Sequence, residues 1–550
     1  VLREQGGYRE DFFIDAVDHE FCLRLRQRGW LVLEVRGVIL DHRQGRWERR
    51  PLQGRAIGVN DYPAVRRYYQ SRNRLVVYRQ FAFFDPGWMA HDAWEYTREL
   101  VKLILVGKKR GPKFRAIARD AIKASQEAGA QGASARVARV RDVSVQWRDG
   151  QIEQVTESTT RGLALSLYVD GRFASVSTSD LRREAIEPFI ADAVAMTRTL
   201  SEDPFRTLSD PSLYANRPAI DLEFSDPDYG SVTAARRKDL ARSIEEAARS
   251  VPQASRILSV TTSVSDSRSE VFRVTSNGFE GERVDTSFWL SGSVTVQDDD
   301  GRRPEDGDFS GGRFVKDLGD PTPVGVSATQ RALARLGSTK APSKVMTLVL
   351  DNRTGGRMVG ALLSPLSASS IQQRRSFLEG RAGQIVGSPL LHVIDEPLIP
   401  RGFGSRHFDG EGISARRFPI FEDGILRNYY IDTYYGKKLK MAPTTGGTSN
   451  LEWRLGPKTQ QELIKDAGEG LFVTGFLGGN SNGTTGDFSL GIQGFMIRNG
   501  VLAEPVAEMN ISGNQLELWK RLVAVGNDPY TYSAMRTPTL VFEGVSFAGV

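Results

Sequence analysis

The sequence predicts an α+β protein in three parts: an N-terminal segment, a domain of hairpins and helices, and a C-terminal antiparallel, β-rich domain. A chain of 550 residues is long enough for two to four domains. Hairpins and helices occur in blocks rather than in strict β-α alternation. The stretch RLGSTKAPSK (335–344) reads as a linker. We therefore place the parts at 1–115, 116–340 and 341–550.

The N-terminal segment is rich in aromatic and basic residues. Residues 1–120 carry 24 Lys and Arg against 15 Asp and Glu, whereas the rest of the chain is nearly neutral. A local basic bias can attract phosphate or anionic lipid, but solvated arginines on an ordinary surface explain it more simply. MAHDAWEYTRELVKLILVGKKR (89–110) is predicted to be a helix that ends before the pair Gly111-Pro112. No nucleic-acid motif is visible, and no apolar run reaches the roughly 20 residues of a membrane span.

The compartment is inferred from the cysteine count and the N-terminus. The single cysteine, Cys22, excludes an internal disulfide framework and suits a reducing compartment. No signal peptide is visible, so we expect a cytoplasmic protein. The chain begins at Val1, directly in motif-like sequence, and we interpret this start as a truncation.

Alternating strands joined by two-residue turns begin at about residue 135. Five dipeptides between apolar-alternating runs favour the positive φ values of type I′ turns and predict hairpins: Asp149-Gly150, Asp170-Gly171, Asn277-Gly278, Asp423-Gly424 and Asn499-Gly500.

Two predicted helices interrupt these strands. LRREAIEPFIADAVAMTRTL (181–200) and AARRKDLARSIEEAARSV (234–251) both carry apolar residues at helical spacing. Ser179 or Asp180 is the expected N-cap of the first helix. From about residue 345 onward, the sequence reads almost wholly as strands and glycine-rich loops.

The stretch FFIDAVDHEFCLRLRQRG (12–29) looks like a catalytic centre, because Asp15, Asp18 and Glu20 lie beside a histidine and the cysteine. Such carboxylates can bind a metal or act as a general base. Together with LDHRQG and RRYYQSRNRLVVYRQF, the stretch resembles the C-terminal half of family 2 glycosyltransferases of the rhamnosyltransferase type. The resemblance covers about 115 residues. It implies that Asp18 deprotonates the acceptor hydroxyl, that His42 reaches the metal, and that Glu20 lies close to the acceptor.

Sugar transfer also needs a nucleotide-binding half with an Asp-x-Asp metal motif that neutralises the departing diphosphate. No such half precedes the stretch in this sequence. We therefore interpret the segment as a remnant or as the tail of a truncated reading frame.

The remaining residues resemble a second family. VQWRDGQIEQVTESTTRGLALSLYVDGRF, GSRHFDGEGISARRFPIFEDGILRNYYIDTYYGKKL, GNSNGTTGDFSLGIQGFMIRNGVLAEPVAEMNISGN and VGNDPYTYSAMRTPTLVFEGVSFAG are similar to segments of the TldD/PmbA proteins, in the same order. These proteins are described as modulators of DNA gyrase and regarded as peptidases. The resemblance implies an N-terminal α+β domain followed by a β-rich, barrel-like C-terminal domain.

TldD-type members carry His-Glu-x-x-x-His on a helix, where the histidines bind zinc and the glutamate activates water. The matching stretch here is GALLSPLSAS (360–369), which places Ser364 and Ser369 at the two histidines and Pro365 at the glutamate. Serine hydroxyls are poor zinc ligands, and a proline has no basic group and disfavours a helix interior. The TldD-type cysteine ligand near the C-terminus is also missing. We therefore expect no metal and no cofactor in this chain.

The other histidines do not suggest a replacement site. His392 lies in the apolar stretch LLHVID and is expected to be a packed or edge residue. His407 stands near Asp409 and Glu411, yet the family pattern keeps those acids without a histidine. No serine nucleophile can be paired with a base from the sequence.

The resemblance therefore points to the PmbA/TldE type, the zinc-less subunit of a heterodimeric metalloprotease that trims unfolded peptides. Zinc is expected in the partner, a TldD-type paralogue with the His-Glu-x-x-x-His motif. The glycine-rich stretch FLGGNSNGTTGDFS (476–489) suits a peptide cleft, because glycines let a foreign backbone approach closely. The candidate substrate-binding residues are Gly478, Gly479, Asn480 and Asn482.

Several alternatives stay open. The glycine-rich stretch is equally compatible with a flexible surface loop. The chain could be a glycosyltransferase remnant or fusion, a peptidase with a non-zinc mechanism, or a non-catalytic structural or binding module. The sequence alone leaves it uncertain whether the chain is an enzyme.

Overall fold

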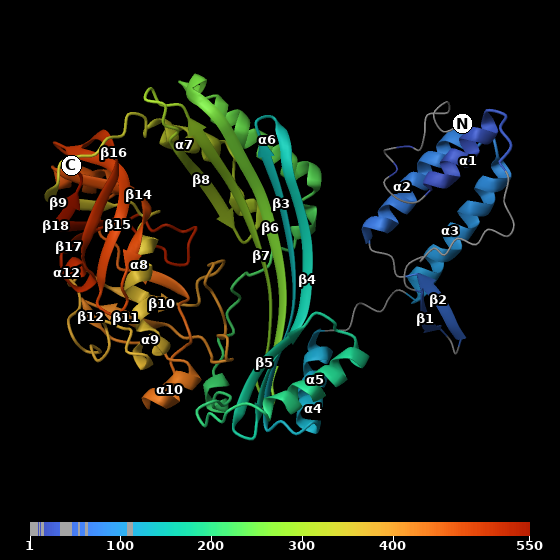
Figure 1. The fold of residues 1–550 in the computed structure, drawn as a ribbon, viewed down its shortest axis with the longest axis horizontal. Coiled ribbons are helices and arrows are strands. Elements are labelled where there is room, and N and C mark those ends of the chain that lie inside the picture. Colours follow the sequence, from blue (N-terminus) through green and yellow to red (C-terminus); the bar gives the residue numbers. More distant parts are fainter. Residues whose placement is uncertain are drawn as a thin grey trace. The chain divides into compact units, whose positions relative to one another are not determined.

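The chain forms two compact units, Val1–Lys113 and Phe114–Val550, both drawn in Figure 1. The structure is a computed structural model, and it describes residues 9, 12, 16–32, 47–52, 55–60, 64–106 and 114–550.

The described part of the first unit contains three helices and one hairpin. The helices are α1 (Val17–Gln27), α2 (Ala64–Phe81) and α3 (Pro86–Val106), and the hairpin pairs β1 (Trp47–Leu52) with β2 (Arg55–Asn60). The helix predicted over 89–110 is confirmed as α3. Among the described helices of the chain, none has the length and apolar character to cross a membrane. A small apolar cluster packs α1 against α2: Phe12, Leu23, Val77 and Phe81.

The first half of the second unit is a long, curved, six-stranded antiparallel sheet (Figure 1). Its strand order is β5-β4-β3-β6-β7-β8. The strands are β3 (Gly132–Arg148), β4 (Gln151–Val169), β5 (Arg172–Thr178), β6 (Ile257–Thr275), β7 (Glu280–Val296) and β8 (Glu305–Gly312).

All five predicted hairpins are present, and four of their turns have the expected backbone. Asp149, Asp170, Asp423 and Asn499 have φ values of 46° to 52°, and each precedes a glycine with positive φ. The fifth turn differs, because only its glycine, Gly278, has positive φ. The amide of Asn277 is engaged there, since its oxygen accepts from Thr275 Oγ1 and its nitrogen donates to the Ser209 carbonyl.

Four helices cover one face of this sheet. The helices are α4 (Phe114–Glu127), α5 (Arg183–Thr197), α6 (Ala234–Arg249) and α7 (Thr322–Leu333). On β7, buried Phe288, Leu290 and Val294 alternate with the half-buried Trp289, Ser291 and Ser293, so the apolar side chains pack under α6 and α7. The opposite face is left without helices.

The two helices predicted at 181–200 and 234–251 are confirmed as α5 and α6, whereas α4 and α7 were not predicted. The expected N-cap at Ser179 or Asp180 is wrong. The Asp180 carboxylate accepts from the Arg182 N–H, but Arg182 itself is the N-cap.

The second half of the unit contains a closed barrel, as the family resemblance implied, but its sheet is not wholly antiparallel as expected. Its sheet has the order β16-β15-β14-β9-β18-β17, and an additional β16–β18 pairing closes a ring of five strands. The β9–β14 pair is parallel. The strands are β9 (Lys344–Leu350), β14 (Gly470–Ser481), β15 (Asp487–Arg498), β16 (Val501–Asn514), β17 (Leu522–Val525) and β18 (Leu540–Ala548).

Short helices accompany the barrel, so the expectation of an almost purely strand-and-loop domain is wrong. They are α8 (Gly356–Leu363), α9 (Ala368–Gln372), α10 (Thr433–Leu439), α11 (Gln460–Ala467) and α12 (Gln515–Lys520). A small sheet of order β12-β11-β10-β13 also packs there. Its strands are β10 (Val393–Glu396), β11 (Phe418–Glu422), β12 (Ile425–Leu426) and β13 (Asn450–Trp453).

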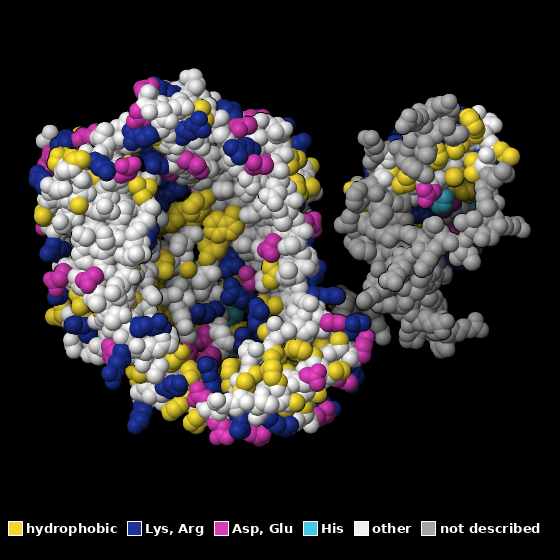
Figure 2. All heavy atoms as spheres, viewed as in Figure 1, with side chains coloured by type: hydrophobic (Ala, Val, Ile, Leu, Met, Phe, Trp, Pro, Cys, Tyr) yellow, Lys and Arg dark blue, Asp and Glu magenta, His cyan; other side chains and the backbone are white. Residues whose placement is uncertain are grey.

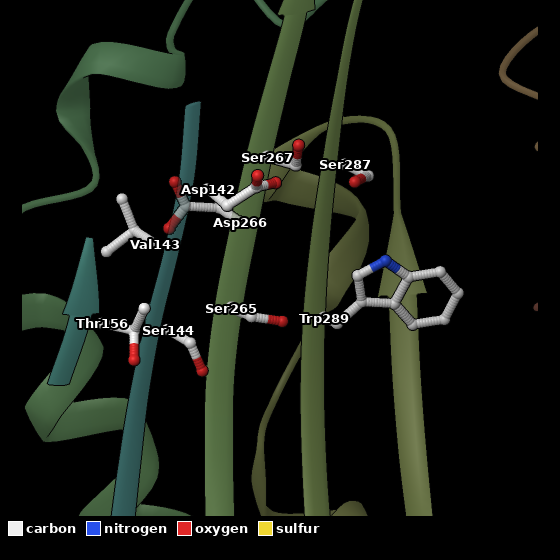
Figure 3. A pocket seen from close by; sticks show the side chains of 9 residues that line it. All are labelled: Asp142, Val143, Ser144, Thr156, Ser265, Asp266, Ser267, Ser287 and Trp289. Carbon is white, nitrogen blue, oxygen red and sulfur yellow. The ribbon is translucent and has the colours of Figure 1, made fainter. Parts of the chain in front are cut away.

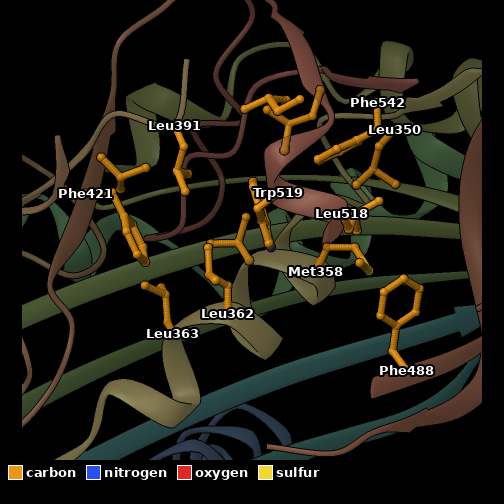
Figure 4. Packing of buried hydrophobic residues seen from close by; sticks show 14 of the residues in the cluster. Leu350, Met358, Leu362, Leu363, Leu391, Phe421, Phe488, Leu518, Trp519 and Phe542 are labelled. Atoms are coloured by element: carbon orange, nitrogen blue, oxygen red, sulfur yellow. The ribbon is translucent and has the colours of Figure 1, made fainter. Parts of the chain in front are cut away.

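One apolar core joins the barrel, α8, α12 and the small sheet. Figure 4 shows Met358 and Leu362 from α8 beside Trp519 from α12, with Phe542 from β18 and Phe421 from β11 in the same cluster. Burial of side chains of this size stabilises the fold by about 1.5–3 kcal/mol each. The core therefore fixes α8, and with it the segment that follows α8.

Candidate functional site

The helix-free face of the six-stranded sheet faces the barrel, and Figure 2 shows the molecule hollowed between them, with hydrophobic side chains on the floor. We call this hollow the cleft. Trp289 on β7 stacks on Phe403 from the barrel half, with ring centroids 4.8 Å apart. At another point Ser209 and Thr433 share a hydrogen bond of 2.7 Å. The two halves of the second unit thus meet through polar and aromatic contacts at the borders of the cleft.

A pocket of about 240 Å³ opens on the sheet side of the cleft (Figure 3). The strand register builds it, because Ser144 lies opposite both Thr156 and Ser265, and Ser265 lies opposite Trp289. Pockets for small-molecule ligands are usually about 300–1,000 Å³, so this one suits a single side chain better. The lining residues are Asp142, Val143, Ser144, Thr156, Ser265, Asp266, Ser267, Ser287 and Trp289.

Aromatic side chains continue the floor of the cleft beyond Trp289. Phe309 on β8 contacts Tyr530 edge-on at 5.9 Å and also approaches Tyr532. The guanidinium of Arg353 lies 5.6 Å from the Phe309 ring centre and 5.9 Å from that of Tyr530. Burial raises the pKa of Tyr530 to about 12, so its hydroxyl stays protonated at neutral pH. These rings give this part of the cleft an apolar surface.

The segment 364–369, for which the sequence suggested a match to the zinc motif, follows α8 on the side of the barrel turned toward the sheet (Figure 1). Helix α8 ends at Leu363, and Ser364 begins a single 3-10 turn. Ser367 then has an extended backbone (φ −70°, ψ 139°) and caps α9, accepting from the Ser370 N–H. Ser364 and Ser369 therefore lie on different helical segments, with Pro365 buried between them.

These residues do not fit a zinc ion. The donor atoms are two serine hydroxyls, and Ser369 Oγ lies 3.2 Å from Ser367 Oγ. Within the described ranges, no group of three or more His, Cys, Asp or Glu side chains could hold a metal. His407 Nε2 lies 2.8 Å from the Ile220 carbonyl oxygen, and His392 lies at the start of β10 with Nδ1 3.5 Å from Asp423.

The predicted substrate residues lie at the end of the β14–β15 hairpin. Gly478 and Gly479 have φ values of 151° and 96° beside an irregularity in the strand register. The Arg357 guanidinium donates to both of their carbonyl oxygens at 3.1 Å. Asn480 and Asn482 are exposed, and the Asn482 side chain accepts from the Thr484 N–H at 2.9 Å.

The structure brings this hairpin next to the altered zinc segment. The Phe377 N–H donates to the Gly483 carbonyl at 2.9 Å, which ties the hairpin end to the chain after α9. A Cβ atom on Gly483 would lie 3.8 Å from Pro365 Cγ. Two sets of residues chosen from separate sequence motifs therefore share one region.

Among the described residues, the N-terminal candidates Asp18 and Glu20 do not come together in one site. Asp18 is exposed on α1, whereas Glu20 is 1% exposed and pairs with Arg24 at 3.1 Å. Residues two positions apart on a helix point to different sides. His42 lies outside the described residues, so its expected role stays a prediction.

The cleft aromatics and Arg353 were missed from the sequence. Their positions, from 289 to 532, share no motif spacing. One sequence pattern in β6 could have indicated the cleft face: in SVTTSVSDSRS (259–269), every second residue is a serine or threonine. That alternation marks a strand face that is not packed under helices.

Family models for three successive domains match this chain. The PmbA/TldA metallopeptidase domain 1 matches residues 133–197, the central domain matches 227–336, and the C-terminal domain matches 343–549.

Individual relatives agree with these matches. Metalloprotease PmbA of Escherichia coli O157:H7 is 29% identical over 424 residues, covering 76% of this chain and 92% of the relative. A Bacteroides thetaiotaomicron structure, described as a candidate modulator of DNA gyrase, is 38% identical with a TM-score of 0.77 and covers 79% of this chain and 99% of that one. TldE from Thermococcus kodakarensis shares the fold, with a TM-score of 0.67 at 19% identity, over 79% of this chain and 100% of that one. The chain belongs to the PmbA/TldD metallopeptidase family.

Proposed function

We propose that this chain is the zinc-less, PmbA/TldE-type subunit of a metallopeptidase that trims unfolded peptides. The observation that carries the proposal is the segment Ser364–Ser369, where hydroxyls and a proline replace the zinc ligands and the base. The zinc and the water-activating glutamate then come from a TldD-type partner with the His-Glu-x-x-x-His motif. This chain contributes the shape of the cleft and part of the peptide-binding surface.

The sheet side of the cleft supports binding of an extended peptide. β5 pairs with β4 only over Leu163–Val169, so residues 151–162 of β4 keep an unpaired edge within the described part of the chain. An extended peptide can add to such an edge through main-chain hydrogen bonds, with alternate side chains entering pockets. Thr156 lies on this edge and lines the pocket of the cleft. The glycines and asparagines of residues 478–482 are the proposed contacts on the barrel side.

The test is co-expression with a His-Glu-x-x-x-His paralogue, followed by size-exclusion chromatography and cleavage of an unfolded peptide. We expect a stable complex, since obligate interfaces commonly bury more than about 2,000 Å². Cleavage should require both subunits and should disappear when the partner's motif glutamate becomes glutamine. Ser364→Ala in this chain is the matched control and should change the rate little.

One outcome would reject the proposal: the partner alone cleaving as fast as the mixture. A non-catalytic structural or binding module would then be the better description of this chain. The resemblance of residues 1–115 to a glycosyltransferase remnant and the cytoplasmic location stay predictions, which expression analysis and cell fractionation can test.

A further inference from the structure

Two arginines lie side by side on the cleft face of the sheet. Arg136 on β3 is directly opposite Arg273 on β6 in the antiparallel register. Both share the face of Ser144 and Ser265, because side chains of equal parity along a strand point to one side. Eight residues separate each arginine from its serine, which corresponds to about 27 Å along the sheet. The arginine pair is therefore a site separate from the pocket.

Neither guanidinium has a protein partner. No hydrogen bond, ion pair or ring contact joins Arg136 or Arg273 to any residue that the structure describes. Each guanidinium carries five N–H donors and no acceptor. Like charges directly opposite each other on a sheet destabilise it. The two guanidinium groups therefore repel each other in the free protein, and an anion bound between them would offset this repulsion.

The residues beside the two arginines on the neighbouring strands are small. Arg136 lies opposite Ala164 on β4, and Arg273 lies opposite Gly281 on β7. The four residues form one row across the sheet, in which only the two central side chains are long. The space over Gly281 is occupied by Phe408, which closes the row on the β7 side.

The two carboxylates that act electrostatically on Arg273, those of Asp409 and Glu411, already accept hydrogen bonds from other groups. Asp409 accepts from the backbone N–H groups of Glu411, Ile413 and Gly446 and from the Thr445 hydroxyl. Glu411 accepts from the Thr433 N–H and hydroxyl, both at 2.9 Å.

Burial is the main influence on the pKa of Arg273. Burial lowers the pKa of Arg273, and repulsion from Arg136 lowers it further, while Asp409, Glu411 and Tyr168 act in the opposite direction. Burial and the neighbouring Arg136 thus disfavour the charged form of the Arg273 guanidinium.

We propose that Arg136 and Arg273 form a carboxylate-binding site, which takes the free C-terminal carboxylate or an acidic side chain of a peptide in the cleft. The inference rests on the proposed function for its peptide ligand. Two guanidinium groups facing one space can hold a carboxylate through charge-assisted, bidentate hydrogen bonds. Small flanking side chains leave the backbone of such a peptide free to lie along the sheet.

The test uses the full chain and three fluorescein-labelled peptides of about ten residues. One peptide has a free C-terminus and no Asp or Glu, the second is its C-terminal amide, and the third is the amide with one internal Glu. Fluorescence anisotropy should show that at least one carboxylate-bearing peptide binds about tenfold more tightly than the plain amide. The peptide that shows the gain identifies the source of the carboxylate.

Arg136→Met and Arg273→Met should each abolish this gain while keeping the aliphatic stem. Arg139→Met is the matched control, since Arg139 is an exposed residue of the same strand that points to the other face. Neither cleft variant should unfold more easily than the wild type, because each removes a like-charge contact. Equal binding of all three peptides, or an unchanged gain in Arg273→Met, would overturn the inference.

A second measurement separates this inference from the proposed function. Acetate, compared with chloride at equal ionic strength, should raise the thermal midpoint of the wild type and of Arg139→Met but not of the two cleft variants. If no peptide binds but this acetate effect is present, the carboxylate site stands and peptide binding by the isolated chain fails. If acetate has no arginine-dependent effect and the peptides show no gain, the site does not exist.

Discussion

Arg237→Met is expected to destabilise the sheet half of the second unit by about 3–5 kcal/mol. Arg237 on α6 forms a two-bond ion pair with Asp266 on β6, with Nε–Oδ2 and Nη2–Oδ1 distances of 2.5 and 3.0 Å. The two side chains are 5% and 1% exposed. Removing the guanidinium leaves a carboxylate buried without its counter-charge, which is the costly half of breaking such a pair.

The same helix offers a matched control. Arg242 on α6 pairs with Asp239 at 3.4 Å and Glu246 at 3.5 Å, and all three side chains are exposed. Exposed pairs contribute about 0–1 kcal/mol, so Arg242→Met should change stability by less than that. The double variant Arg237→Met/Asp266→Asn should regain part of the loss, because it removes the unpaired buried charge.

Hydrogen exchange by mass spectrometry on α6 and β6 is the appropriate assay, because a unit of this size need not unfold in two states. A loss of 3 kcal/mol or more corresponds to exchange faster by about a hundredfold or more. Because Asp266 also lines the pocket of the cleft, loosening should extend to β6 beside that pocket. If Arg237→Met accelerates exchange no more than Arg242→Met does, the ion pair is not what holds α6 on the sheet.

Four further outcomes are expected. Gly479→Ala should lower the thermal midpoint more than Gly483→Ala, because a Cβ at Gly479 would lie 2.1 Å from the Ser489 carbonyl oxygen and φ is positive there, whereas Gly483 has ordinary contacts. Burial raises the pKa of Glu411, so its stabilising contribution is present below its unfolded pKa and is lost as pH rises through the folded pKa; Glu411→Gln should give a flatter stability profile from pH 4 to 8. A fragment of residues 114–550 should unfold cooperatively, since it contains its own cores, and an aggregated fragment would contradict this. Elemental analysis of the purified chain should find no stoichiometric zinc, and about one zinc per chain would reject that expectation.

Local features of the fold could be predicted from the sequence, and non-local features could not. Type I′ turns depend on two residues, so Asp149-Gly150 and Asn499-Gly500 identify hairpins without knowledge of the rest of the chain. The parallel β9–β14 pair joins residues more than 120 positions apart, and no turn signal marks it. The short helices α8–α12 have five to eight residues, too few for a clear helical period.

The residues of the candidate site also divide into those that a local sequence motif could identify and those that depend on non-local contacts. Ser364 and Pro365 could be proposed from the sequence, because the family resemblance sets a contiguous motif against them. The pair Arg136 and Arg273 could not, because its meaning depends on a cross-strand register between residues that lie 137 positions apart. The same limit applies to Trp289 and Phe403, which meet only after the sheet and the barrel pack together.

Under the proposed alignment with the zinc motif, residues 364–369 differ from a zinc site in their backbone as well as in their side chains. A helical His-Glu-x-x-x-His motif places its ligands through one continuous run of helical residues. Here the run stops at Leu363, and Ser367 is extended, so Ser364 and Ser369 no longer have helical spacing. Pro365 also lacks the N–H that a continuous helix would use. Placing two histidines and a glutamate at these positions would therefore supply the ligand atoms without their geometry, which is why the proposed function assigns the zinc to a partner subunit.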